Sequence, residues 1–572
     1  MDQTKIHNAW NPGLESDIPP AWRELETIHR TENVFTRLAD VLEISKFTGL
    51  PPEELVTFRP ERLALHELIV QVNAGLVIPE GNTEEELGNN FRLMAGTILK
   101  QYIEPHLTEV IETYDQLNRD VFELVGETLS KLQDTPGGNK KIEPPSLWSR
   151  LLGKRQRKLV STETQADREF RQITEFKQKG LATDNSLHEA LYKSLYRVIG
   201  RILNFRGYVG TDNELLTTLV SRHVCNRYGS RVIGKLIAPW VQQAIEIEGY
   251  TVLPDSDKAF LISLKGASAA GKSSLRAILP SLIEEKNLDR NTFGTISPDI
   301  WRKFLLDYES LDSAYKYFGR MTSQEVIIVD GKLDRYIRAK ARRNKAIPNL
   351  LVDRFRFDSF TSENIPRILY DTYARYTDVM YMYFVVTPPE ETVVRGWERG
   401  LQRGRFKSVE DFLDHSLEAS IGMPKVLFRW LSHKEFNYHF EFLDNSVPKG
   451  TYPKTIAKGT GEKMTIFHPV GLINLERYQK INIRAKTADE VYPDGPELDV
   501  ENNLKFLTQC IKQIPNIDFA IEDSGIVYLE CHNGAFSIVD QELYLSCCED
   551  SQTNQLFTEI NVKPNLNQAI IA

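Results

Sequence analysis

The sequence predicts a multidomain protein with an all-α N-terminal region, a central α/β region built on a parallel sheet, and a small α+β C-terminal domain. Three observations support this prediction. At 572 residues the chain is too long for a single hydrophobic core. Apolar residues recur three and four apart through most of the first 250 residues, as in amphipathic helices. From residue 258 onward, apolar strand-like runs alternate with helical segments, which is typical of a parallel sheet covered by helices.

The N-terminal helices are predicted in two groups. Helical spacing first covers the stretches 22–44, 62–74 and 84–132. The next segment contains Pro-Gly-Gly, Pro-Pro and a basic run, Lys-Arg-Gln-Arg-Lys, and we interpret it as an exposed linker. Helical spacing then resumes up to the first strand. The predicted divisions are a helical domain over 1–132, a linker over 133–165 and a second helical region over 166–249.

The central region, expected to span 250–450, contains five predicted strands. They are the apolar runs 259–264, 292–297, 349–352, 378–387 and 438–443. A long helix is predicted over 323–345. The C-terminal domain, 451–572, combines one predicted helix, 502–514, with strands at 465–467, 526–531, 536–539 and 543–546.

Composition and charge exclude several classes of protein. The net charge of -9 argues against a protein whose main task is to grip a nucleic-acid backbone, so nucleic acid is an unlikely partner, although local basic runs exist. Five cysteines without regular spacing predict neither a zinc site nor a disulfide framework. No apolar stretch approaches the length of a membrane span, and the N-terminus does not resemble a signal peptide. We therefore expect no membrane partner and a cytoplasmic protein, with delivery into another cell left open.

The first predicted strand runs into a glycine-rich loop, Gly-Ala-Ser-Ala-Ala-Gly-Lys-Ser, followed by a helix-forming stretch. Such glycines let successive backbone N–H groups face a polyphosphate at the start of the helix, and the pattern predicts a nucleoside triphosphate site in a P-loop core, without indicating what happens to the γ-phosphate. We expect Lys272 to reach the β- and γ-phosphates and Ser273 to bind Mg²⁺. The predicted nucleotide contacts in this loop are Gly266, Ala267, Ser268, Ala269, Ala270, Gly271, Lys272, Ser273 and Ser274.

An acid follows the second predicted strand. Asp299 and Arg302 lie three apart, directly after 292–297, at the sheet edge that is expected to face the loop. A carboxylate at this place can accept the proton of a hydroxyl group that attacks the γ-phosphate, so Asp299 is the predicted catalytic base. The simpler alternative is that Asp299 caps the helix that begins near residue 300.

Four arginines follow the strand 378–387. Arg395, Arg399 and Arg403 recur four apart and share one helical face, and Arg405 follows Gly404. Arginines this close repel one another unless anions lie between them, and a transferred phosphoryl group is such an anion. Glycines at 396, 400 and 404 favour a mobile lid over the triphosphate. The alternative interpretation is a solvated basic helix face.

Together these motifs resemble the zeta-toxin group of P-loop kinases over residues 258–446. The resemblance consists of the Walker-type loop, the Asp-x-x-Arg motif, the long helix, a strand that ends in an acid, and the arginine-bearing lid. Those enzymes phosphorylate a hydroxyl of UDP-N-acetylglucosamine-type sugars with ATP or GTP. The resemblance implies that Lys272, Ser273 and Asp299 act in nucleotide binding, Mg²⁺ binding and base catalysis, and that Arg399 and Arg405 are the catalytic lid arginines. Arg403 is a further expected nucleotide contact.

One segment departs from the family pattern. After the strand 349–352 the chain reads Asp353-Arg354-Phe355-Arg356-Phe357-Asp358, where the family has a smaller turn. This bulkier turn is expected to line the acceptor pocket, so the resemblance does not establish a sugar-nucleotide acceptor. We expect Asp353 to assist Mg²⁺, and Arg302, Asp353 and Arg356 to contact the acceptor.

The resulting prediction is a kinase that moves the γ-phosphate of ATP or GTP to a hydroxyl of a small phosphorylated acceptor such as a nucleotide sugar. A protein partner of the helical N-terminal region is a further possibility. Two alternatives fit the same residues. One is a polynucleotide 5′-hydroxyl kinase, because the Asp-x-x-Arg motif resembles that family too. The other is a nucleotide-gated interaction protein, which has little need for a base and a lid.

Overall fold

The computed structural model describes residues 7–81, 83–133, 165–277, 283–284, 288–354, 373–433, 437–448 and 451–562. The chain forms two compact units. The larger unit contains 1–25, 69–97 and 244–572, and the smaller one contains 26–68 and 98–243. Residues 69–97 thus belong with the central region, although the sequence groups them with the N-terminal helices. Most of the predicted linker, 134–164, lies outside the described residues, so the predicted domain divisions stay a prediction.

The smaller unit is helical, as expected. Within it, α7 (Ser186–Arg206) shows how the sequence sets a helix. The side chain of Asn185 accepts hydrogen bonds from the N–H groups of Leu187 and His188 at its start, and Gly207 ends it with a φ of 79°. The other helical elements with residues in this unit are α1 (Leu38–Thr48), α2 (Pro52–Leu55), α3 (Pro60–Gly75), α4 (Glu84–Ile98), η2 (Leu99–Ile103), η3 (Glu104–His106), α5 (Leu107–Gln133), α6 (Gln165–Ala182), α8 (Asn213–Val224), η4 (Cys225–Gly229) and α9 (Ser230–Glu248). No helix in the described parts of the chain combines the length and the apolar character needed to cross a bilayer.

The larger unit is built on one ten-stranded sheet with the order β10-β9-β8-β7-β6-β5-β4-β1-β3-β2. Its strands are β1 (Ala259–Gly266), β2 (Phe293–Ile296), β3 (Asn349–Asp353), β4 (Thr377–Val386), β5 (Asn437–Asp444), β6 (Lys454–Gly459), β7 (Lys463–Ile466), β8 (Asn516–Ala520), β9 (Val527–His532) and β10 (Ala535–Ile538). The first five pair in parallel, with Ile262 of β1 opposite Leu351 and Tyr381. All five central strands predicted from the sequence are confirmed. Parallel neighbours need a long crossover, and helices provide it in the described connections from β2 to β3 and from β4 to β5.

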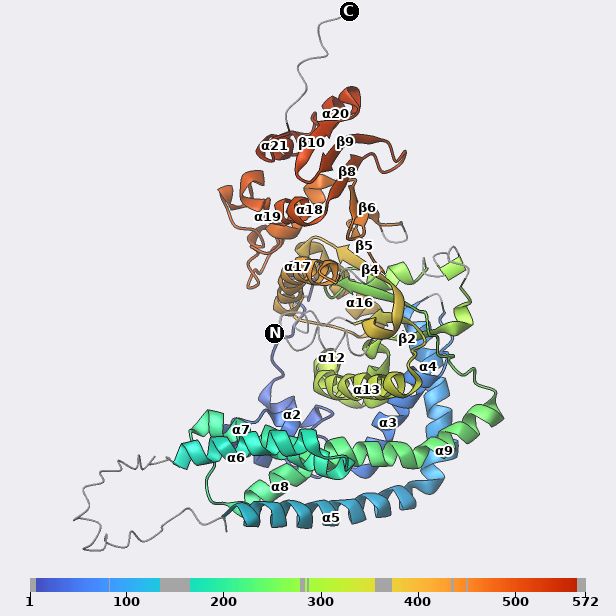
Figure 1. The fold of residues 1–572 in the computed structure, drawn as a ribbon, viewed down its shortest axis with the longest axis vertical. Helices are drawn as coiled ribbons and strands as arrows, with labels where there is room; N and C mark the ends of the chain where they lie inside the picture. Colours follow the sequence, from blue (N-terminus) through green and yellow to red (C-terminus); the bar gives the residue numbers. More distant parts are fainter. Residues whose placement is uncertain are drawn as a thin grey trace, which may run out of the picture. The chain divides into compact units, whose positions relative to one another are not determined.

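The sheet continues across residue 450. Strand β6 pairs antiparallel with β5, and β7 to β10 extend the same sheet (Figure 1), drawn in orange and red. The predicted strand at 543–546 is wrong. These residues lie in helix α20 (Gln541–Cys547), because Asp540 caps the N–H groups of Glu542 and Leu543. The predicted helix 502–514 corresponds to α19 (Lys505–Gln513), preceded by η12 (Val500–Asn503). The remaining C-terminal elements are α18 (Pro469–Arg477), η10 (Ala488–Glu490), η11 (Pro496–Leu498) and α21 (Ser551–Glu559).

Helices of the larger unit surround the parallel strands of the sheet. The predicted long helix is α13 (Ser323–Asn344), whose Val326, Val329, Leu333 and Ile337 are buried at helical spacing. Helix α17 (Val409–Leu431) packs on β1 and β5. The other helical elements of this region are η1 (Pro20–Leu25), η5 (Lys272–Ala277), η6 (Arg290–Thr292), η7 (Pro298–Trp301), α11 (Arg302–Leu305), η8 (Glu309–Tyr317), α12 (Phe318–Met321), η9 (Ala374–Tyr376) and α16 (Pro389–Arg403). The carboxyl ends of the five parallel strands meet at one edge, where the predicted functional residues gather.

Candidate active site

The loop after β1 contains two residues with left-handed backbone angles and is fixed to the sheet by side-chain hydrogen bonds. Ala269 and Gly271 have φ angles of 64° and 95°, in the left-handed region. The carbonyl of Ala270 accepts hydrogen bonds from Asn445 Nδ2, at 2.7 Å, and from Thr387 Oγ1, at 3.0 Å. Both partners directly follow central strands, β5 and β4. The loop is therefore fastened to the sheet edge, and a Cβ at Gly271 would lie 1.9 Å from Asn445 Nδ2.

Lys272 folds over this loop. Its Nζ donates to the carbonyls of Gly266, at 2.9 Å, and Ala267, at 3.0 Å. Desolvation lowers the pKa of Lys272, and the carboxylates of Asp353 and Asp299 oppose this effect. Lys272 also begins η5, so a tight helical turn follows the loop. The side chains of Ser273 and Ser274, predicted to bind Mg²⁺ and nucleotide, lie outside the described part of the structure.

Asp299 is bound by two arginines from different parts of the chain. Its Oδ1 accepts from Arg302 Nε at 2.8 Å, and its Oδ2 accepts from Arg405. Burial raises the pKa of Asp299, but the charges of Arg405 and Arg302 outweigh it and lower that pKa well below the ordinary 3.8. Ser297, rather than Asp299, is the N-cap residue of η7. Asp299 therefore does not cap this helix, contrary to the alternative interpretation of its position in the sequence.

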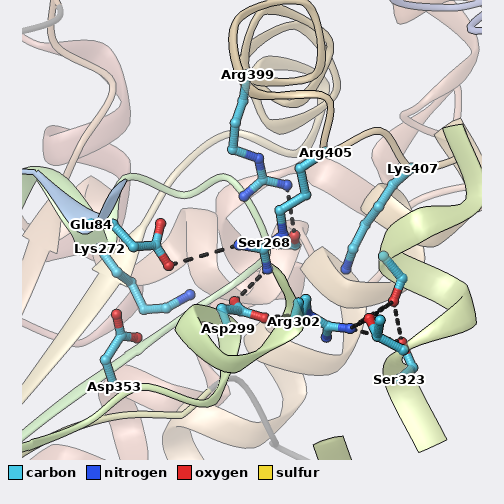
Figure 2. A network of polar contacts seen from close by, with 12 residues as sticks. Glu84, Ser268, Lys272, Asp299, Arg302, Ser323, Asp353, Arg399, Arg405 and Lys407 are labelled. Atoms are coloured by element: carbon cyan, nitrogen blue, oxygen red, sulfur yellow. Dashed lines mark hydrogen bonds and ion pairs between the residues drawn. The ribbon is translucent and has the colours of Figure 1, made fainter. Parts of the chain in front are cut away.

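The arginines of α16 and the segment that follows it differ in the groups that they contact. Arg399 Nη2 lies 3.5 Å from Ser268 Oγ in the loop, and its buried Nε has no hydrogen-bond partner among the described residues. Arg405, just beyond the helix, reaches Asp299 (Figure 2). Arg395 instead pairs with Glu391 of its own helix at 2.7 Å. Burial and the neighbouring Arg405 lower the pKa of Arg399. An unsatisfied, repelled cation beside the loop is suited to an anionic ligand.

The three glycines of this segment have a role in packing. A Cβ at Gly396 would lie 2.0 Å from the ring of Phe412, and one at Gly400 would lie 2.4 Å from the ring of Phe406. Gly404 ends α16 with a φ of 70°, against the ring of Tyr308. The sequence associates these glycines with lid mobility. The structure gives a different reason for them, since each allows an aromatic ring to approach the helix closely.

The predicted acceptor residues are placed as follows. Arg302 is held by α12 and α13, because its Nη1 donates to Gly319 O at 2.6 Å and to Thr322 Oγ1 at 2.7 Å. Asp353 ends β3 and pairs with Arg276 Nη2 at 3.4 Å. Arg356 lies outside the described residues.

Several site residues were not predicted. Glu84, at the start of α4, lies 3.7 Å from Arg405 (Figure 2). It also lies 3.8 Å from Arg403. Arg276, in η5, pairs with Glu80 as well as with Asp353. Glu80 and Glu84 are far from the motifs in sequence, and no local pattern distinguishes them.

Lys407 was not predicted either, although it stands two residues after Arg405. Its Nζ lies 3.1 Å from His415 Nδ1. Burial and the charges of Arg405 and Arg399 lower the pKa of Lys407 well below its ordinary value, and burial likewise lowers that of His415. The basic character of the stretch after α16 is the signal that could have identified it.

Three cavities adjoin at the sheet edge. A cavity of about 510 Å³ lies beside Ala269 and Gly271 and is bordered by Arg395, Arg399, Asn445 and Pro448. A small cavity of about 90 Å³ is lined by the loop together with Glu84, Lys272, Asp299, Arg399 and Arg405. A third, of about 380 Å³, lies between η8, α12, α13 and α17. Residues shared by the small and the third cavity are Asp299, Arg302, Asp353, Arg405 and Lys407.

The carboxylates at this sheet edge suit a metal ion that takes most of its ligand atoms from bound phosphate and water. Within the described ranges, no three His, Cys, Asp or Glu side chains cluster closely enough to hold a metal ion by themselves. Asp353 and Asp299 nevertheless line the same small cavity as Lys272. Magnesium in phosphate-transferring sites needs only one or two carboxylates in addition to phosphate oxygens and water.

Comparisons with known proteins find little. No protein-family model and no curated protein matches the chain. Among solved structures, a chain from the PezAT chromosomal toxin–antitoxin system of Streptococcus pneumoniae is similar, with 16% sequence identity and a TM-score of 0.23, over 34% of this chain and 71% of the other. A similarity at this level carries no inference about activity or substrate.

Proposed function

We propose that this chain is a zeta-toxin-like kinase that transfers the γ-phosphate of ATP or GTP to a hydroxyl of a small phosphorylated acceptor, such as a nucleotide sugar. One observation carries the proposal. Asp299 lines both the small cavity at the glycine-rich loop and the 380 Å³ cavity beyond it. A base at such a junction is within reach of a phosphate on one side and of a hydroxyl on the other.

The nucleotide is expected to extend across two cavities. The 510 Å³ cavity has room for a nucleoside, and its border residues Ala269 and Gly271 belong to the loop that would hold the triphosphate. Arg399 lines both cavities and carries an unpartnered Nε. Its guanidinium is therefore a suitable partner for the β- and γ-phosphates, together with Lys272.

The chemistry follows from the residues at the junction. The acceptor oxygen forms a bond to the γ-phosphorus while the bond from this phosphorus to the β–γ bridging oxygen breaks. The hydroxyl proton passes to Asp299. The nucleoside diphosphate, ADP or GDP, leaves, and Lys272 and the loop N–H groups stabilise its negative charge. Mg²⁺, when bound, neutralises charge on the β- and γ-phosphates, and Asp353 and Ser273 are the residues that would help to hold it.

The pairing of Arg405 with Asp299 has a consequence for the base. Paired with two arginines, Asp299 binds a proton weakly because its pKa is lowered. We expect a bound γ-phosphate to draw Arg405 away from the carboxylate, since the phosphate carries more charge. This exchange would restore basicity to Asp299 only when the nucleotide is in place.

The 380 Å³ cavity favours a small acceptor over a polymer. Its lining contains groups that can donate hydrogen bonds to a phosphate, Lys316, Arg320 and Lys407, and acids that suit sugar hydroxyls, Asp330 and Asp411. Its volume is of the order of a site for one small molecule. A protein partner of the helical unit remains a separate proposal without a contact to support it.

The test is a transfer assay with γ-labelled ATP and Mg²⁺. The acceptors are UDP-N-acetylglucosamine, a hexose phosphate and an oligonucleotide with a free 5′-hydroxyl. We expect label on a small acceptor with the wild type and with Lys258→Ala, an exposed lysine at the start of the β1 segment. Lys272→Ala should abolish it. Label that survives Lys272→Ala contradicts the proposal, and label on the oligonucleotide alone supports the polynucleotide kinase instead.

A further inference from the structure

The N-terminal residues 8–25, which we call the N-terminal strap, belong to the larger compact unit and run along the 380 Å³ cavity. Three polar contacts fix the strap there. Lys316 Nζ donates to the carbonyl of Pro12 at 2.7 Å, and the N–H of Glu15 donates to Tyr317 Oη at 3.1 Å. The hydroxyls of Ser16 and Ser408 are hydrogen-bonded at 2.7 Å. The strap is thus tied to η8 and to the residue that caps α17.

Apolar packing holds both ends of the strap. Toward its carboxyl end, Ile18 is buried with Leu311 and Phe318, and Trp22 meets the ring of Tyr317 edge-on with centroids 5.4 Å apart. Toward its amino end, Ala9 and Trp10 pack against a buried cluster of α16 and α17 that contains Val393, Val409, Phe412 and Leu413. The strap therefore connects η8 and α12, on one side of the cavity, with α16 and α17, on the other. Ordered packing on both sides makes its middle part a defined wall.

The middle of the strap supplies lining residues. Leu14, Glu15 and Ser16 line the same cavity as Asp299 and Lys407. Leu14 and Ser16 are half-buried, as expected for side chains that face an enclosed space and not open solvent. They add an apolar group and a hydroxyl to a cavity lined both by charged groups, such as Asp299, and by apolar ones, such as Val326 and Phe406.

We propose that Leu14 and Ser16 are part of the acceptor site and determine which small molecule fits beside Asp299. This inference rests on the proposed kinase function. Arg320 and Lys407 can donate hydrogen bonds to any phosphorylated molecule, so these two groups alone do not select among acceptors. Selection then depends on the shape of the wall, and the strap is the part of the wall that comes from outside the central α/β region. The strap residues bind and orient the acceptor and take no part in proton transfer.

The test uses two changes of opposite size and a control in the same segment. Leu14→Trp fills the cavity, Leu14→Ala enlarges it, and Asp17→Ala changes an exposed strap residue that does not line it. The full-length proteins are assayed for transfer of label from ATP to UDP-N-acetylglucosamine, to a hexose phosphate and to a free hexose. The Kd for ATP is measured separately by calorimetry.

We expect Leu14→Trp to raise the KM for the best acceptor at least tenfold, with the Kd for ATP within twofold of the wild type. Leu14→Ala should change the order of preference among the three acceptors, and Asp17→Ala should change nothing. Unchanged acceptor KM values and unchanged preference in both Leu14 variants would overturn the inference while the kinase function stands. A wild type that binds ATP but labels none of the acceptors overturns the proposed function, and the inference with it.

Discussion

Arg405 donates a hydrogen bond to Asp299 across 106 positions of sequence, and this contact joins the segment after α16 to the end of β2. Arg302, on the other side, binds the second oxygen of the same carboxylate at 2.8 Å. The base of the proposed reaction is therefore held by two cations before any ligand arrives. Each of those cations lines the small cavity in which a γ-phosphate would lie. We therefore expect binding of a nucleotide and release of the base to be coupled.

Removal of the base should affect chemistry and spare binding. We expect Asp299→Asn to lower the transfer rate between about a hundredfold and ten-thousandfold, the usual contribution of a general base. ATP binding should be retained and should tighten, because Lys272 and the loop remain and Asp299 no longer competes with the γ-phosphate for Arg405. Rapid-quench measurement of transfer, together with calorimetry, checks both. Asp378→Asn, at the exposed start of β4, is the matched acid-to-amide control. Equal losses of affinity and rate would instead indicate a structural role.

The ion pair also predicts a pH dependence of stability. Arg405 and Arg302 lower the pKa of Asp299 in the folded protein well below 3.8, so the carboxylate stabilises the fold above pH 3.8 and loses this effect as the pH falls through its folded pKa. In Arg405→Gln one of these cations is absent, and the folded pKa rises. Protonation of Asp299 in the unfolded state is the same for both proteins, so the difference in their free energies of unfolding should shrink as the pH falls through the folded pKa of Asp299 in the variant. Urea unfolding at several pH values measures it.

The control for that experiment is Arg320→Gln. Arg320 lies in the same part of the fold but is 3.9 Å from Asp411 and does not contact Asp299. The difference in free energy of unfolding between Arg320→Gln and the wild type should depend less on pH over the same acidic range. A difference for Arg405→Gln that stays constant down to the lowest pH at which both proteins fold would contradict the assignment of the shift to this pair.

Glu84 should weaken nucleotide binding. Its carboxylate lines the small cavity and lies 3.7 Å from Arg405, where it competes with phosphate for the same cation. We expect Glu84→Gln to tighten ATP binding roughly fivefold, about 1 kcal/mol, which is the size of one partly exposed ion pair. The neighbouring Glu85 pairs with Lys303 at 2.8 Å and does not line this cavity, so Glu85→Gln should leave the Kd unchanged. Calorimetry that finds weaker binding in Glu84→Gln would rule out the competition.

Gly271 should be intolerant of any side chain for two separable reasons. Its φ of 95° strains a non-glycine residue by about 1–3 kcal/mol, and a Cβ would collide with Asn445 Nδ2. Gly495 has a similar φ of 99° with nothing within 4 Å of the added Cβ. Gly271→Ala should therefore be the more destabilising of the two in thermal unfolding. It should also weaken ATP binding, which Gly495→Ala should not do. Equal effects would show that backbone strain alone is responsible.

The central strands could be predicted because each is a continuous apolar run such as Ala259–Gly266, buried on both faces of a parallel sheet. The loop after β1 was visible for a similar reason, since closely spaced glycines and a lysine form a local signal. The C-terminal region was predicted less well. At 543–546 the capping effect of Asp540 outweighed the strand-like composition of a short run.

Two features of the site depended on three-dimensional contacts. Glu84 approaches Arg405, and Ser16 bonds Ser408 across 392 positions, without any pattern that links these segments in sequence. The glycines of α16 were visible, but their role was not, because only the fold places Phe406 and Phe412 against them.

The sequence by itself determined the five central strands, the glycine-rich loop and the position of Asp299 after β2, because each depends on residues within a few positions of one another. The tertiary structure decided which charges surround Asp299 and which segment closes the cavity beside it. Those outcomes depend on burial and on electrostatic contacts between distant segments, and such contacts form only when the sheet edge brings the segments together.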